Sequence, residues 1–361
     1  MEKQSNITGM LDLILRPAFC VRDGSIVCAN RQAQSRGIVT GTHISDLLVT
    51  GAEEYAALRG SCLYLTVQIE SIQFGASVTK MDGLDVFIIE PEEIQPELQA
   101  LALAARELRE PLSNLMTAAD RLLPTLDEAD DTAQKQAANI NRSLHHMLRL
   151  LDNMSDSARY AEKQTPRQEY RNVRSLMEEF FENASSLVEN AGITLNFTNY
   201  PDDVKSMVDV EKLRRAVYNL ISNAVKFSPK GGHIDAKFTR HGNTMYLTVT
   251  DNGRGIPQEQ FSSLYFRYLR PSCVEDSRHG IGLGMVIVQA AAAAHGGTVL
   301  IEQPPEGGTK VTLALAIRPQ TNGNFHSPAS LSIDYTGGRD RGLVELSDLL
   351  PASSFQSKKI N

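Results

Sequence analysis

The run Asn219-Leu-Ile-Ser-Asn223-Ala-Val-Lys226-Phe227 decides how the fold of this chain is interpreted. Its two asparagines and its lysine are spaced four and three residues apart, so in a helix the three side chains share one face. An amide oxygen is a hard, neutral ligand suited to Mg²⁺, which keeps several waters and binds substrate phosphates. A lysine one turn further on supplies a positive charge for phosphate, and Phe227 offers an aromatic surface for a purine. The run therefore predicts a helix whose side chains suit a nucleotide and Mg²⁺; the alternative is a solvated pair of asparagines, which is common on helices.

Two glycine-rich segments supply further parts of such a site. Asp251-Asn-Gly253-Arg-Gly255 places a carboxylate at the end of a predicted strand, followed by two glycines. A carboxylate there can accept a hydrogen bond from the exocyclic amine of adenine, and the glycines let the backbone approach a ligand. The second segment, Gly280-Ile-Gly282-Leu283-Gly284, precedes a predicted helix. Its backbone amides and the positive end of that helix make a cradle for an anion.

The order and spacing of these three segments are similar to the N, G1 and G2 boxes of the ATPase family shared by histidine kinases, Hsp90, gyrase B and MutL. Segment 261–266 lies where the kinases carry their F box, and Gly307-Gly308-Thr309 lies where they carry a last glycine motif. The resemblance covers residues 168–318 and implies the α/β-sandwich (Bergerat) fold of the GHKL family, with ATP and Mg²⁺ as ligands and residues 258–282 as a lid. By this resemblance Asn223 holds Mg²⁺ with Asn219 beside it, and Lys226 contacts phosphate. Phe227 packs on adenine, and Asp251 binds the adenine amine. The resemblance gives as further cofactor contacts Gly253, Gly255, Gly280, Gly282, Leu283 and Gly284.

The elements around these boxes alternate as expected for an α/β unit. The hydrophobic pattern predicts helices over 173–190, 210–227 and 285–295, and strands over 193–199, 233–240, 244–251, 298–303 and 309–317. The last two strands form a hairpin across Gly307-Gly308 that is expected to close the sheet. His295 precedes Gly296-Gly297 at a helix end, where a positive charge favours the helix dipole.

Two longer amphipathic helices are predicted upstream, with Pro91 and Pro96 before the first and Pro124 at its end. Asp130 and Asp131 are suited to open the second. One apolar stripe on each helix cannot be buried by a single hairpin, whereas two copies bury theirs in a four-helix bundle. A homodimer is therefore expected. The stripes contain Leu98, Leu101, Ala105, Leu108, Leu112, Leu115, Ala119 and Leu122, and then Ala133, Ala137, Ile140, Leu144, Leu148 and Leu151.

Within the first of these helices, Glu107-Leu108-Arg109 and Pro111-Leu112 look like the histidine kinase H box, His-Glu-Leu-Arg-Thr-Pro-Leu. The chain departs from it twice, because Arg106 replaces the phosphoacceptor histidine and Glu110 replaces the threonine. Phosphoryl transfer needs a lone pair in line with the γ-phosphate. Neutral imidazole has one near pH 7, but guanidinium stays protonated and has none. The resemblance thus identifies Glu107 as the H-box acid and position 106 as a missing acceptor.

Arg106 has two further interpretations. It lies four residues before Glu110, so the two can form an ion pair on a solvated helix face, worth only about 0.2–0.5 kcal/mol. Alternatively, its guanidinium contacts the γ-phosphate of docked ATP and stabilises a nucleotide-bound state.

Other histidines offer a substitute acceptor. His145 and His146 lie on the second long helix, where adjacent residues point about 100° apart, so one is expected to face the bundle and the other the solvent. Both lie on a different helix from Glu107, which argues against them. His279, in the expected lid, is better placed to contact phosphate.

Residues 1–90 have the pattern of a small α+β unit. Two short apolar runs flank Asp23-Gly24, which predicts a hairpin, and Asn30 stands where a helix cap is expected. Strands are predicted over 62–70, 72–80 and 84–90. This order of hairpin, short helical region and three strands resembles a PAS sensor domain; a generic α+β interaction domain is the alternative, because a fold alone does not give a ligand.

The composition limits the remaining function classes. A net charge of -7 argues against nucleic-acid binding. The four cysteines, Cys20, Cys28, Cys62 and Cys273, show no paired spacing and are expected to be reduced thiols. No apolar run approaches the roughly 18 residues of a membrane span, so a cytoplasmic protein is expected. In the tail, the leucines of 343–350 predict a short helix that docks on a folded domain or a partner.

Four regions are therefore expected: a PAS-like unit over 1–90, a dimerising hairpin over 91–165, an ATP-binding domain over 166–318 and a tail over 319–361. The resemblance implies a two-component sensor of the histidine kinase family, with a response regulator or an intact histidine kinase as partner. Two functions stay open. In one, phosphoryl transfer survives through another histidine or a partner's histidine; in the other, the protein is a pseudokinase dimer whose ATP occupancy sets its binding to a partner.

Overall fold

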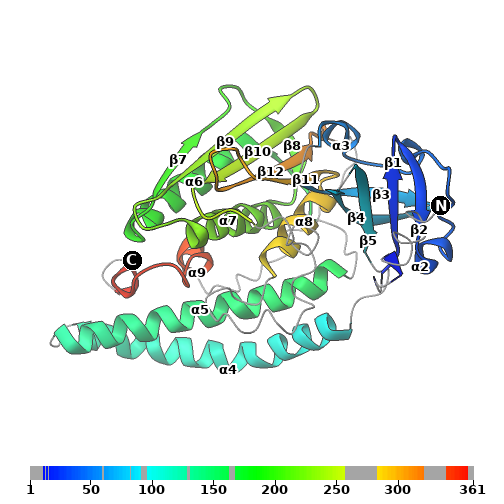
Figure 1. Ribbon diagram of the computed structural model, residues 1–361. Coiled ribbons are helices and arrows are strands. Elements are labelled where there is room, and N and C mark those ends of the chain that lie inside the picture. The colour runs from blue at the N-terminus through cyan, green and yellow to red at the C-terminus, as the bar shows by residue number, and fades with distance from the viewer. Residues whose placement is uncertain are drawn as a thin grey trace.

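The computed structural model describes residues 11–12, 14, 16–58, 61–81, 83–90, 96–127, 131–161, 167–256, 283–320 and 339–356. Within these ranges the chain forms an N-terminal α+β unit, a long helical hairpin and a C-terminal α/β unit (Figure 1). No helix among the described residues combines the length and the apolar character that crossing a membrane requires.

The N-terminal unit begins with the predicted hairpin. Strands β1 (Ala18–Arg22) and β2 (Ser25–Ala29) pair antiparallel, and the turn between them has φ of 50° at Asp23 and 78° at Gly24. Two left-handed residues in succession suit the twist of a two-residue hairpin, which is why Asp-Gly is the signal. Asn30 caps the next helix, because its Oδ1 accepts a hydrogen bond from the amide of Ala33 at 2.9 Å.

The remaining elements of this unit follow in the predicted order. They are α2 (Arg31–Gln34), a 3-10 turn (Ile44–Asp46), α3 (Ala52–Ala57), β3 (Cys62–Ile69), β4 (Ile72–Met81) and β5 (Leu84–Ile89). The strands lie in the order β2-β1-β5-β4-β3, all antiparallel. Phe19 and Phe87 stack at 4.8 Å between ring centroids in the core.

Three of the four cysteines are described, and all three are free and buried. The sequence spacing gave no pair, yet Cys20 and Cys28 lie directly opposite each other on β1 and β2. Burial, together with a smaller contribution from the neighbouring Cys28, raises the pKa of the Cys20 thiol to about 12. The Cys20 thiol is therefore protonated and weakly nucleophilic at neutral pH.

The helical hairpin consists of α4 (Pro96–Asp127) and α5 (Asp131–Ala161). The prediction that Pro124 ends the first helix was wrong, because α4 continues to Asp127. A proline inside a helix removes one hydrogen bond and crowds the carbonyl four residues before it, yet α4 continues through position 124, and Leu123 beside it is buried. The opposite surface keeps large apolar side chains exposed, namely Leu103, Leu108, Leu115, Leu122, Ile140 and Met147.

The C-terminal unit packs three helices on one face of its strands (Figure 1). The helices are α6 (Val173–Asn190), α7 (Val210–Phe227) and α8 (Gly284–Ala294), and the strands are β7 (Thr194–Thr198), β9 (His233–His241), β10 (Thr244–Asp251), β11 (Thr298–Glu302) and β12 (Thr309–Ala316). These elements were all predicted. A separate ladder of β6 (Glu169–Asn172) and β8 (Lys205–Val208) was not, since four-residue strands give too short a pattern.

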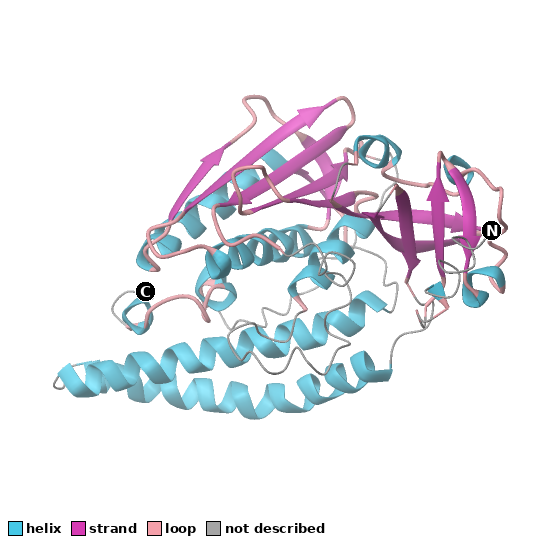
Figure 2. Cartoon of the chain, viewed as in Figure 1, coloured by secondary structure: helices cyan, strands magenta, loops and turns pink. Residues whose placement is uncertain are grey.

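One sheet runs through the N-terminal unit and the C-terminal unit (Figure 2), in the order β2-β1-β5-β4-β3-β11-β12-β10-β9-β7. The join is an antiparallel pairing of β3 with β11, in which Tyr64 opposes Val299 and Cys62 opposes Ile301. The prediction that the β11–β12 hairpin closes the sheet was therefore wrong. The sequence contains no local signal for this pairing, which covers the edge of β11 that would otherwise expose unpaired backbone groups.

The predicted docking of the tail is confirmed. Residues Arg341–Glu345 form α9 and Ala352–Phe355 form a 3-10 turn. Leu343, Leu346 and Leu350 are buried in the core of the C-terminal unit. In Figure 1 this segment lies between α5 and α7.

Candidate nucleotide-binding site

Helix α7 presents the first segment of the predicted site. Asp209 caps it by accepting a hydrogen bond from the amide of Lys212 at 3.1 Å. Asn219 is buried, and its Nδ2 donates to the carbonyl of Arg215 at 2.8 Å. Asn223, one turn further on, is half-buried, so the two amides lie on the same face as predicted.

The start of α8 lies against these two amides. A Cβ added at Gly284 would come within 2.8 Å of the Asn219 Oδ1 and 3.8 Å of the Asn223 Nδ2. Asn223 Nδ2 also lies 3.7 Å from the sulfur of Met285, a contact that sequence reasoning missed. The close approach explains the glycine at 284, and it brings the helix N-terminus beside the expected Mg²⁺ ligand. Leu283, just before it, is buried.

Asp251, at the end of β10, is held by backbone amides. Its Oδ1 accepts hydrogen bonds from Gly253 at 2.8 Å and from Thr309 at 3.2 Å. Burial raises the pKa of this carboxyl, and the two amides oppose the rise. Thr309 belongs to the last glycine motif, so the structure brings together two segments 58 residues apart.

The glycines after Asp251 permit close backbone packing. A Cβ at Gly253 would lie 2.8 Å from the Asp251 Oδ1. Gly255 has φ of 70°, in the left-handed region, and a Cβ there would lie 2.7 Å from the Nε2 of Gln303. Gln303 follows β11, and its position was not predictable from any motif. Both glycines are therefore required by the local geometry.

Phe227 and Lys226 end α7 beside these loops. The guanidinium carbon of Arg254 lies 5.3 Å from the centroid of the Phe227 ring, so a cation covers one face of the aromatic surface expected to pack on adenine. Lys226 is half-buried, and its charge helps to lower the pKa of His146 on α5. Arg254 lies inside the second segment, but the pattern gave no role for it.

The remaining predicted contacts lie outside the described residues. These are Gly280, Gly282, His279, the F-box segment 261–266 and the whole of the lid 258–282. The described part thus brings Asn219, Asn223 and Gly284 together, and it places Gly253, next to Asp251, against the backbone of Phe227 at the end of α7.

The H-box side chains lie on the surface of α4. Arg106, Glu107 and Glu110 are exposed. Although Arg106 and Glu110 are both described, they form no ion pair with each other, so that prediction was wrong; the weak gain from an exposed pair does not offset the ordering of two long side chains. Arg109 instead pairs with Asp152 of α5 at 2.9 Å.

The candidate substitute acceptors are covered. His145 is 1% exposed, and its Nδ1 lies 2.8 Å from the carbonyl of Asn141. His146 is half-buried, so neither ring faces solvent freely, and burial lowers the pKa of both. Both imidazoles are therefore neutral at pH 7.

His295 also differs from its prediction. It is buried, its Nδ1 lies 2.7 Å from the carbonyl of Ala291, and its Nε2 accepts from the amide of Asp209 at 2.9 Å. Burial lowers its pKa. It is therefore a neutral link between α8 and the start of α7, and it adds no charge to the helix dipole.

Comparisons with known proteins agree with this geometry. The family described as "Histidine kinase-, DNA gyrase B-, and HSP90-like ATPase" matches residues 208–319. "Histidine kinase P4" of Formosa agariphila is 28% identical over 233 residues, which is 63% of this chain and 17% of that protein. "Sensor histidine kinase WalK" of Bacillus subtilis is 27% identical over 253 residues, or 67% of this chain and 41% of that protein.

Residues 208–319 belong to the ATPase family shared by histidine kinases, DNA gyrase B and HSP90, and the two relatives above are named histidine kinases. The α7, α8 and β9–β12 elements form the GHKL-type ATPase domain of that family. The chain spans less than half the length of these two relatives. Among solved structures, full-length ShkA in complex with AMPPNP has a TM-score of 0.49 and 21% identity, and the alignment covers 62% of this chain and 46% of that one.

Proposed function

We propose that this protein is a dimeric pseudokinase of two-component signalling: it binds Mg-ATP in its ATPase domain but has no phosphoacceptor of its own. Nucleotide occupancy and the state of the N-terminal unit then set its contact with a partner. The observation that carries this proposal is that the start of α8 lies against Asn219 and Asn223, while an exposed arginine occupies the acceptor position.

The residues present fit Mg-ATP. In the described part of the chain, His, Cys, Asp and Glu nowhere gather in groups of three, so no carboxylate cage for a cation exists there. Mg²⁺ does not need one, since it uses few protein ligands, several waters and substrate phosphates. Asn223 supplies the amide oxygen, and the N-terminus of α8 beside it favours phosphate.

The base and the phosphate have separate partners. Both hydrogen bonds that Asp251 accepts within the described chain end on Oδ1, which supports Oδ2 as the acceptor for the adenine amine. Phe227 provides an apolar ring for the base. Lys226, with Gly280, Gly282 and Leu283, is proposed to contact the phosphates.

Position 106 determines what the bound nucleotide can do. A guanidinium has no lone pair for the γ-phosphate, and Glu107 beside it has no imidazole to orient. His145 is buried under the C-terminal segment, so it offers no route in this arrangement. The chemistry therefore favours nucleotide-dependent binding over autophosphorylation.

A second copy of the chain is the proposed occupant of the exposed hairpin face. Leu108, Leu115 and Leu122 follow one another at heptad spacing on α4 and stay more than half exposed. Seven-residue spacing of leucines is typical of a helix–helix seam. A cytoplasmic homodimer with a PAS-like N-terminal unit, and a response regulator or intact histidine kinase as partner, is the assembly we propose.

Replacing Leu115 by glutamate is expected to convert the dimer into a monomer, because a carboxylate would be buried in an apolar seam without a partner. The dimer dissociation constant should rise at least about tenfold. Sedimentation equilibrium measures it, and Ser113→Glu on the other side of α4 is the matched control. A wild-type protein that is monomeric at micromolar concentration would remove the dimer from the proposal.

Replacing Asn223 by alanine tests the nucleotide site. The affinity for Mg-ATP is expected to fall about tenfold or more, and its dependence on Mg²⁺ to weaken, because the amide ligand is lost. Calorimetric titration with and without Mg²⁺ measures both. Asn190→Ala, at an exposed end of α6, is the matched control. An unchanged affinity in Asn223→Ala would show that this residue is not the Mg²⁺ ligand.

A further inference from the structure

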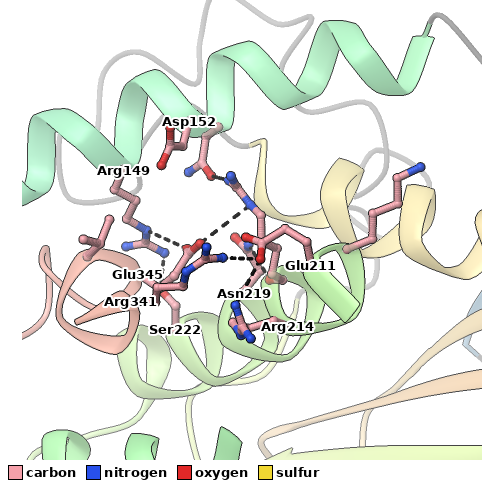
Figure 3. Close-up of polar contacts among 12 residues, drawn as sticks. Arg149, Asp152, Glu211, Arg214, Asn219, Ser222, Arg341 and Glu345 are labelled. Atoms are coloured by element: carbon pink, nitrogen blue, oxygen red, sulfur yellow. Dashed lines mark hydrogen bonds and ion pairs between the residues drawn. The ribbon is translucent and has the colours of Figure 1, made fainter. Parts of the chain in front are cut away.

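The contact between the ATPase domain and the hairpin has a buried ionic centre supplied by the C-terminal segment. Glu345 of α9 lies between Arg149 of α5 and Arg215 of α7, with its carboxylate 3.8 Å and 3.6 Å from their Nε atoms (Figure 3). Arg149 also donates from Nη2 to the Ser222 Oγ of α7 at 2.8 Å and pairs with Asp348. Three segments far apart in sequence thus meet at one carboxylate.

The two arginines explain why that carboxylate matters. Both side chains are only 8% exposed, and they come from opposite sides of the contact between the hairpin and the ATPase domain. Two guanidiniums so close together repel each other and are poorly solvated. Glu345 provides the compensating charge, and Arg215 gains a further bond to the Asn153 Oδ1 at 2.6 Å. Without the segment, Arg149 would lose Glu345 and Asp348, and Arg215 would lose Glu345.

The apolar side chains of the segment bridge the same two bodies. Leu343 and Leu346 are buried in the ATPase core, whereas Val344, between them, is buried in the hairpin core with Leu112 and Leu148. Consecutive residues of one short helix therefore complete two separate cores. Helix α9 therefore connects the ATPase domain rigidly to the hairpin, because a movement of either core would displace side chains packed in the other.

Both ends of the segment are tied down as well. Arg339 donates to the Asp120 carboxylate of α4 at 2.6 Å, and Arg341 pairs with Glu211 of α7. At the other end, the carbonyl of Phe355 accepts from the Asn141 Nδ2 at 2.9 Å. The Phe355 ring packs edge-on against His145 with centroids 5.2 Å apart.

From these contacts we infer that residues 339–356 are a regulatory strap: they fasten the ATPase domain to α4 and α5, and their release frees that domain from the hairpin and uncovers His145. The strap acts through charge, since Glu345 neutralises the Arg149–Arg215 pair. It is independent of whether the ATP site is occupied. The ATPase fold itself does not need Glu345, whose ion pair with this domain is with Arg215 of α7 and not with a residue of the sheet.

Hydrogen–deuterium exchange on Glu345→Gln tests the strap. The variant keeps the shape of the side chain and loses the charge, so backbone exchange in 141–149, 215–222 and 339–356 is expected to become at least about tenfold faster. Exchange in β9 and β10 should stay unchanged. Glu178→Gln, which removes the partner of Arg174 on the outer surface of α6, is the matched control and should leave all of these regions as they are.

A second variant separates charge from shape. In Arg149→Gln/Glu345→Gln the repulsion between the arginines is gone, so protection of 141–149 and 215–222 is expected to recover at least in part relative to Glu345→Gln. Carbethoxylation of His145 should be fast in Glu345→Gln and slow in the wild type and in the double variant. The strap proposal would be contradicted if exchange in Glu345→Gln stayed unchanged, or if it also rose throughout β9 and β10. A double variant that is less protected than Glu345→Gln would contradict it as well.

Discussion

Arg106→His is expected to acquire acid-labile phosphoryl label from γ-labelled Mg-ATP, whereas the wild-type protein stays at background. Position 106 is exposed on α4 beside Glu107, and an imidazole there restores a neutral nitrogen nucleophile. The label should rise at least about 100-fold over the wild type, because the substitution supplies the one group without which covalent transfer cannot start.

Two variants check the origin of that label. Arg106→Gln removes the charge without adding an imidazole and should stay unlabelled. Arg106→His/Asn223→Ala should lose the label, since it lacks the proposed Mg²⁺ ligand. Label on the wild-type protein, mapped to His145 or His146, would show an alternative acceptor. No label on Arg106→His would show that the ATP site is not competent for transfer.

Asp251→Asn is expected to abolish nucleotide binding while making the unliganded protein more stable. The asparagine oxygen still accepts from Gly253 and Thr309, but the amide can no longer bind the adenine amine as a carboxylate does. The affinity for Mg-ATP should fall at least about 100-fold, because a polar group of the site is then mismatched. Thermal unfolding with and without Mg-ATP measures both effects.

The stability gain of Asp251→Asn has a defined pH dependence. Burial raises the pKa of Asp251 in the folded state, so the folded wild type binds the carboxyl proton more tightly than the unfolded chain does. This tighter binding stabilises the fold at low pH, and the stabilisation is lost as the pH rises through the raised pKa. The variant should therefore gain about 1 kcal/mol at pH 7–8, and the gain should shrink as the pH falls toward 4. Asp235→Asn, at an exposed position on β9, should show neither effect. A variant that is less stable at pH 8 than at pH 4, relative to the wild type, contradicts the assignment.

The regular elements of this protein were predictable where local patterns are strong. The helix over Val173–Asn190 and the helix that carries Asn219 and Asn223 follow from apolar periodicity, and the Asp23-Gly24 hairpin follows from turn chemistry. Pro124 led to a wrong helix end because a proline usually breaks or kinks a helix, whereas α4 passes through this position and ends at Asp127.

Long-range contacts were the part that sequence reasoning missed. The pairing of β3 with β11 depends on the backbone edge of two distant strands, which no side-chain pattern encodes. The grouping of Arg149, Arg215 and Glu345 likewise arises from three separate segments. Within the site, the motif order predicted the residues that meet, but not Met285 against Asn223 or Arg254 over Phe227.

The pseudokinase proposal is tested most directly by calorimetric titration of Mg-ATP into the unmodified protein. The nucleotide is then recovered, and the protein is assayed for a phosphoryl label. We predict saturable binding at one site per chain, absent in Asp251→Asn, with ATP recovered intact and no phosphoryl group on the protein. The absence of binding, or a phosphoryl group on the unmodified protein, would contradict it.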